Sequence, residues 1–213
     1  MPPSAGWLQE LQTDPALLEQ EIEGTRERLE SETDLRWRDS LELSIKRMGR
    51  LQEVLPTMEF RYPNLTFEKR LAFEGTRRRT ELHVVEPGHT DSDAYLLLPE
   101  ERVLFMGDLG FFGSQPFMAF CDPAAWREWL KEAEDFDVET FVPGHGPLGT
   151  GADLGLKRQY IALVEDLVAQ AVQAGLTVEE TMAQALPEPF DAWLMGGMAR
   201  WEANVGALYQ HLA

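Results

Sequence analysis

Three short stretches of the chain decide its fold: residues 88–93 read GHTDSD, residues 98–108 read LPEERVLFMGD, and residues 142–146 read VPGHG. Each stretch places one polar side chain directly after a predicted strand, and these side chains are His89, Asp108 and His145. Neighbouring glycines let the backbone turn sharply at each of these points. Two imidazoles and a carboxylate are suitable ligands for zinc, iron or manganese, so the three residues are candidate metal ligands.

Any one of these stretches alone is weak evidence for a metal site. A Gly-Asp pair after a strand is usually a turn, and a Pro-Gly-His-Gly sequence is usually a loop. Found in this order, on alternating strand and helix units, the three stretches are far more specific. We therefore expect His89, Asp108 and His145 to converge within one coordination sphere, in which each ligand lies about 2.0–2.2 Å from a zinc ion.

The order and spacing of these stretches resemble those of the metallo-β-lactamase superfamily, from about residue 65 to about residue 160. They are similar to the third, fourth and fifth metal motifs of that family. The resemblance implies an α/β fold, the αββα sandwich, of which this chain would carry the C-terminal half. It implies that His89 binds a first metal ion, that His145 binds a second, and that Asp108 bridges both and is the catalytic residue. The one or two ions, zinc by default and otherwise iron or manganese, would activate a water molecule for hydrolysis.

The leading motif of that family, His-x-His-x-Asp-His, is missing from this sequence. No two of the four histidines lie within two residues of each other. Three interpretations are open: a shortened form of a complete enzyme, a natural remnant that dimerises to cover its exposed sheet, or one half of a site that a partner chain completes. The first is favoured, since a start assigned too far downstream would produce this pattern.

The resemblance predicts a metal-dependent hydrolase, or a truncated form of one, that acts on a small ester, thioester or amide-type bond. The survival of all three downstream ligands favours the enzyme. The missing first motif favours the alternative, a non-catalytic remnant that serves as a protein-interaction or dimerisation module. The fold by itself does not decide between these functions.

The chain divides into a predicted helical hairpin at residues 1–57, the C-terminal half of the metallo-β-lactamase domain at residues 58–150, and C-terminal helices at residues 151–213. Asp14-Pro15 and Asp122-Pro123 are typical helix starts, in which a capping residue precedes a proline. Thr177 and Glu180 form a capping-box pattern. Strands are expected at residues 58–62, 65–73, 80–85, 94–98, 102–106 and 140–142, and further helices at residues 34–55, 152–174 and 191–211.

The composition limits the classes of partner. The formal net charge of −18 disfavours nucleic acid, because an acidic surface repels phosphate backbones. Cys121 is the only cysteine, which excludes an internal disulfide and fits a reducing, cytoplasmic compartment. No stretch approaches the roughly 18 apolar residues of a membrane span, and the first residues do not resemble a signal peptide. The expected partners are a small-molecule substrate and a second copy or partner chain that covers the exposed sheet.

Several other side chains are expected to have structural roles. His83 alternates with apolar residues and is predicted to point away from the core, and His211 is predicted to be solvated. Cys121, which precedes a helix start, is predicted to pack rather than to react. Three aromatic residues after the second metal-ligand stretch would either line a substrate pocket or pack in the core: Phe111, Phe112 and Phe117.

Overall fold

The computed structural model describes residues 3–33, 35–59, 61, 63–193 and 197–212, and the chain folds into two compact units, Met1–Thr66 and Phe67–Ala213. The first unit consists of α1 (Pro3–Thr13), α2 (Pro15–Ser31), α3 (Leu35–Val54) and the short helix η1 (Leu55–Thr57). Its core is formed by Leu11, Leu18, Ile22 and Leu55. The Asp14 carboxylate accepts a hydrogen bond from the Ala16 amide, which confirms the predicted start of α2. The predicted start of the second helix, Asp34, lies outside the described residues.

The second unit is built on a five-stranded sheet with the order β1-β2-β3-β4-β5. The first four strands are antiparallel neighbours: β1 (Arg70–Glu74), β2 (Arg79–Val85), β3 (Asp93–Leu98) and β4 (Val103–Phe111). Strand β5 (Thr140–His145) pairs parallel to β4, and α4 (Pro123–Glu134) connects the two. After β5 come α5 (Gly151–Gln173), α6 (Val178–Met182), η2 (Phe190–Ala192) and α7 (Gly197–Leu212). Asp122 caps α4, and Thr177 with Glu180 caps α6, as predicted.

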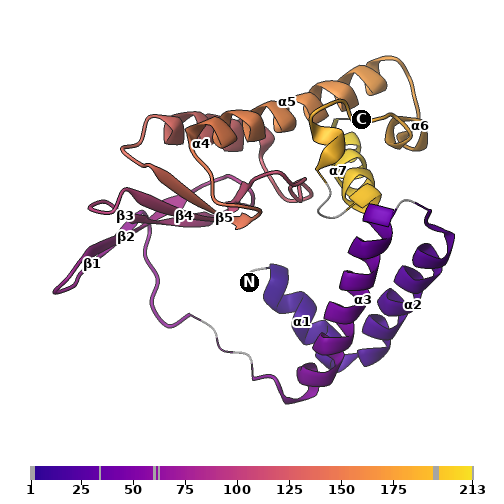
Figure 1. Ribbon diagram of the computed structural model, residues 1–213, viewed down its shortest axis with the longest axis horizontal. Helices are drawn as coiled ribbons and strands as arrows, with labels where there is room; N and C mark the ends of the chain where they lie inside the picture. The colour runs from indigo at the N-terminus through magenta and orange to yellow at the C-terminus, as the bar shows by residue number, and fades with distance from the viewer. Residues whose placement is uncertain (1–2, 34, 60, 62, 194–196, 213) are drawn as a thin grey trace. The chain divides into compact units, whose positions relative to one another are not determined.

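Helices cover one face of this sheet. Figure 1 shows α4 and α5 on the same side of the strands. Leu104, Met106 and Phe141 point to that side and share one core with Trp126 and Leu130 of α4. Because side chains alternate along a strand, every second residue of the same strands must point to the other face.

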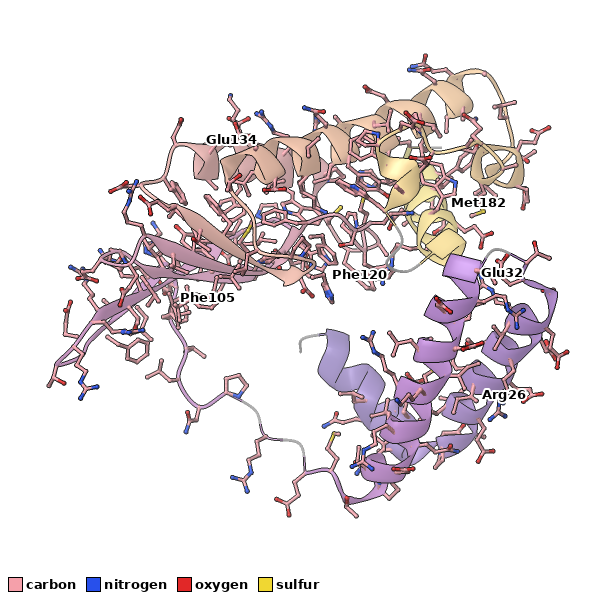
Figure 2. All side chains as sticks on the ribbon, viewed as in Figure 1. Arg26, Glu32, Phe105, Phe120, Glu134 and Met182 are labelled. Atoms are coloured by element: carbon pink, nitrogen blue, oxygen red, sulfur yellow. The ribbon has the colours of Figure 1, made fainter. Side chains whose placement is uncertain are left out.

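The other face carries a continuous row of apolar side chains. The cross-strand register pairs Leu71 with Leu82, then Leu96, Phe105 and Val142, so the row crosses all five strands. None of these residues belongs to the helix-covered core, and Phe105 is 42% exposed (Figure 2). We call them the apolar row. One sheet with helices on one face confirms the predicted α/β class and the partial αββα sandwich.

Some predicted strands have different bounds in the structure. Met58, Glu59 and Arg61 are not in a strand, while residues 60 and 62 lie outside the described part of the chain. Strand β5 continues through Pro143, and β4 continues to Phe111, so both are longer than predicted.

The longer β4 changes the setting of Asp108, which lies inside this strand rather than after it. The β4–β5 register shifts on both sides of Gly107, whose φ of +54° is a conformation that favours glycine. Such an irregularity re-aims the neighbouring side chain and lets the strand continue past it. None of the described helices is both long and apolar enough to cross a membrane.

Candidate metal-ligand site

The structure brings two of the three predicted ligands together. Asp108 and His145 lie on the adjacent parallel strands β4 and β5, near the ends at which both strands finish. Oδ1 of Asp108 is 3.3 Å from Nε2 of His145, and both side chains are partly open to solvent. Two zinc ligands at tetrahedral angles and bonds of about 2.1 Å stand about 3.4 Å apart, so this spacing suits two ligands of one ion.

Two glycines of β5 and its end make this close approach possible. A Cβ atom at Gly144 would stand 2.5 Å from Oδ1 of Asp108, so a side chain there would displace the carboxylate. Gly146 has a φ of +102°, which turns the chain directly after His145. The amide of Phe112 donates a hydrogen bond of 2.9 Å to the carbonyl of His145 and fixes this turn against the end of β4.

His89 lies in the turn between β2 and β3 and is 8% exposed. The Asp93 carboxylate organises this turn by accepting hydrogen bonds from the Thr90 amide, at 2.9 Å, and from the Thr90 hydroxyl, at 3.1 Å. The His89 ring packs against the rings of Phe111, at 5.6 Å between centroids, and of Trp126, at 5.1 Å. Neither ring nitrogen of His89 makes a hydrogen bond of normal length and angle to any residue that the structure describes.

Burial controls the charge of His89. It lowers the pKa of the ring below the usual value, against smaller opposing contributions from Asp93, Asp108 and the Phe117 backbone. The ring is therefore neutral near pH 7, which is the form that binds metal ions.

The predicted convergence of all three ligands is not found. Within the described ranges, no three His, Cys, Asp or Glu side chains are grouped so that they could hold a metal ion. The ring of Phe111 contacts both histidines: it stacks on His145 at 4.6 Å and lies obliquely against His89. Asp108 and His145 thus fit as two ligands, whereas His89 is packed in the helix-covered core, and a stable zinc site needs at least three protein ligands.

Lys157 of α5 is a buried ionisable residue that the sequence analysis did not single out. Its side chain is 0% exposed, and Nζ makes no hydrogen bond to any described residue. Nζ lies 4.3 Å from the ring centroid of Trp126 and 4.7 Å from that of Phe111, the two rings that also contact His89. A spacing signal was present, because Leu154, Lys157 and Ile161 recur at helical intervals on the buried face of α5.

The charge state of Lys157 follows from two opposing effects. Aromatic faces attract an ammonium by about 2 kcal/mol when it is desolvated. Full burial without an acidic partner costs several times more, so desolvation dominates. Burial accordingly lowers the pKa of Lys157 well below its usual value. The amine therefore loses its proton at a lower pH than an exposed lysine does.

A polar network fixes the loop that follows β4. The Asn204 amide of α7 donates to the Pro116 carbonyl, at 2.8 Å, and to the Tyr160 hydroxyl, at 3.3 Å. Its carbonyl oxygen accepts from the Met118 amide at 2.8 Å. The Tyr160 hydroxyl in turn donates to Gln115 at 3.3 Å. This network ties the loop after Phe112 to both α5 and α7.

The remaining candidates have structural surroundings. Burial raises the pKa of the Cys121 thiol to about 12, and the thiol contacts the Met118 carbonyl at 3.2 Å, so it packs as predicted. Phe111 and Phe112 are buried in the core. His211 is exposed, as predicted. The prediction for His83 is wrong: its ring stacks on Tyr95 of the helix-covered face at 4.9 Å and pairs with Glu81 at 2.8 Å.

Comparisons with known proteins agree with this fold. Residues 5–145 match the model of the metallo-beta-lactamase superfamily. Among solved structures, the chain is similar to a double mutant of the sec-alkyl sulfatase PisA1 (TM-score 0.54, 21% identity) and to the sec-alkylsulfatase Pisa1 from Pseudomonas sp. (TM-score 0.53, 19% identity). Both matches cover 70% of this chain and 26% of the sulfatase, so the chain spans about a quarter of the length of these proteins.

A metallo-beta-lactamase from Pontibacter korlensis is similar over 57% of this chain and 62% of its own, with 21% identity and a TM-score of 0.44. No curated protein matches the chain significantly. At these identities the structural likeness shows the fold alone.

Proposed function

We propose that this chain, which belongs to the metallo-β-lactamase superfamily, contributes Asp108 and His145 to the metal centre of a hydrolase. The observation that supports this proposal is the 3.3 Å approach of the two side chains on the parallel strands β4 and β5. A carboxylate oxygen and an imidazole nitrogen suit zinc, and iron or manganese would use the same residues. When bound, the ion supplies an activated water molecule and polarises the bond to be cleaved.

The residues of this chain have different roles in the proposed metal centre. Asp108 and His145 hold the ion, and Gly144 leaves the space in which their side chains meet. His89 is the third candidate ligand, and it joins them only if it leaves its packing against Phe111 and Trp126. The substrate class is a small ester, thioester or amide-type bond, and ligands beyond the described group are needed for a complete centre.

Metal binding by single-residue variants tests this proposal. His145→Ala is expected to weaken zinc binding by at least 10–100-fold, because a ligand contributes more than the outer partners whose loss has that effect. Isothermal titration calorimetry with zinc measures the affinity. His211→Ala is the matched control, since His211 is exposed and lies near the end of α7. Equal zinc affinity in wild type and His145→Ala would exclude the pair as ligands.

The apolar row favours a second candidate function, a dimerisation module. The row joins five apolar side chains across the sheet, and its fourth member, Phe105 of β4, is 42% exposed. Two copies of such a face can pack sheet against sheet, about 10 Å apart, and bury the row. The partner in this reading is a second copy of the chain, and no metal is required.

Self-association distinguishes the second candidate. Phe105→Lys is expected to weaken dimerisation by roughly 100-fold or more, because two symmetric copies each lose the burial of one aromatic side chain. Phe120→Lys is the matched control: Phe120 is 55% exposed but lies outside the row (Figure 2). Light scattering after size-exclusion chromatography measures the mass. A wild-type chain that stays monomeric at high micromolar concentration would eliminate this candidate.

A further inference from the structure

The pair formed by Asp108 and His145 is open to solvent rather than enclosed by the chain. The side chain of Asp108 is 51% exposed and that of His145 is 42% exposed. By contrast, the third candidate ligand, His89, is 8% exposed and packs against two aromatic rings. An ion held by Asp108 and His145 would therefore lie at the surface of the second unit, where another molecule can supply ligands.

The surroundings of the pair leave room for such an approach. Gly144 and Gly146 flank His145, are both exposed, and carry no side chain that could cover the ligands. Pro147 and Leu148 follow in the same turn, and Leu148 is 67% exposed. Because the residues beside His145 are small or apolar, a second protein surface can come close to the pair without removing charged side chains from water.

The two side chains are half of a closed zinc site. A structural zinc ion takes four protein ligands at the corners of a tetrahedron. The 3.3 Å between Oδ1 of Asp108 and Nε2 of His145 fits two of those corners, and no third metal-binding side chain is grouped with them within the described ranges. A tetrahedron has two-fold axes that exchange one pair of corners with the other pair. A second copy of the same two ligands therefore fits the two corners that remain.

Charge favours association of identical chains at this surface only when an ion is present. Each chain has a formal net charge of −18, so two copies repel each other. Two Asp108 carboxylates, one from each copy, balance the double positive charge of a zinc ion, and two neutral His145 rings complete the ligand set. Without the ion, the same two carboxylates would add to the repulsion.

We propose that two copies of this chain share one zinc ion, bound by Asp108 and His145 of both copies. The contact is isologous, because the same surface of each copy faces the other across a two-fold axis. All four positions of the ion are filled, so the ion holds the copies together rather than activating water. This inference rests on the metal binding proposed above for the pair, and it differs from the dimer of the apolar row, which requires no ion.

Molar mass and zinc content, measured together, test the shared site. The full chain is freed of metal with a chelator and then titrated with zinc, while light scattering after size-exclusion chromatography gives the mass. The mass should double as zinc reaches one ion per two chains, and it should fall back when chelator is added again. Calcium at the same concentration should leave the mass unchanged, because calcium takes oxygen ligands rather than imidazole.

Two substitutions at exposed side chains locate the shared ion. His145→Ala and Asp108→Asn each change two of the four ligands, one in each copy, so both should abolish the doubling of the mass. Zinc binding should weaken by at least about 100-fold, because even an outer partner of a ligand is worth about 10–100-fold. His211→Ala, at an exposed histidine near the end of α7, should behave as the wild type does. Circular dichroism checks that each variant is folded.

The possible outcomes separate this inference from the proposed function. One zinc ion per monomeric chain, lost in His145→Ala, would overturn the shared site but keep the proposed metal binding. A wild-type chain that binds no zinc would overturn both. A mass that zinc does not change, or a doubling that survives in His145→Ala, would also overturn the shared site.

Discussion

Replacing Gly146 by alanine should destabilise the second unit by about 4 kcal/mol and move His145 out of its place beside Asp108. The φ of Gly146 is +102°, which costs an alanine about 1–3 kcal/mol. An added Cβ would also overlap the carbonyl oxygen of Phe112. Relieving this overlap shifts the buried Phe112 and breaks its hydrogen bond to the His145 carbonyl, which adds further costs of about 1–3 and about 1 kcal/mol.

Gly113→Ala is the matched control for this change. Gly113 also has a positive φ, +61°, but nothing lies within 4 Å of a Cβ placed there. The Gly113→Ala variant should therefore be destabilised only by the cost of the positive φ, about 1 kcal/mol. Urea unfolding followed by near-ultraviolet circular dichroism compares the two, and the NMR shifts of the His145 ring report its position. If both variants lose the same stability, the overlap with the Phe112 carbonyl does not contribute to the free energy of unfolding.

Lys157→Met should stabilise the protein by about 1–4 kcal/mol at neutral pH, because an apolar chain of similar length fills the site without a buried amine. The substitution should also remove the pH dependence that Lys157 gives to the free energy of unfolding. The folded protein holds the pKa of Lys157 well below the unfolded value near 10.4, so the unfolded chain binds more protons between these values. The contribution of Lys157 to stability is thus fully present above pH 10.4 and is lost as pH falls toward the folded pKa.

The wild-type slope in this window should be at most about 1.4 kcal/mol per pH unit, the value for one proton. The ionisable groups that act on Lys157 come from several elements: Asp108 of β4, Arg200 of α7 and Cys121 before α4. Urea unfolding between pH 7 and pH 10, in buffers free of carbon dioxide, measures the slope. Lys131→Met should keep it. A wild type without any slope would mean that Lys157 is charged in the folded state.

Local signals predicted the parts of the fold that depend on a few neighbouring residues. Asp14-Pro15 and Asp122-Pro123 start helices as expected, because a cap is satisfied by amides two or three residues away. The capping box of Thr177 and Glu180 works for the same reason. The lengths of β4 and β5 could not be predicted this way, since the shifted pairing around Gly107 depends on both strands together.

The candidate site, like the fold, could be predicted from the sequence only in part. The sequence determined which residues can bind a metal, and the resemblance carried by its three stretches was confirmed as family membership. Only the tertiary structure decided that Asp108 meets His145, while His89 packs with Phe111 and Trp126 instead. The type and order of the candidate ligands can be read directly along the chain. The distances between them and their burial depend on elements far apart in sequence, because packing against α4 and α5 determines which side chains are buried. The buried amine of Lys157 and the open apolar row both arise at that level.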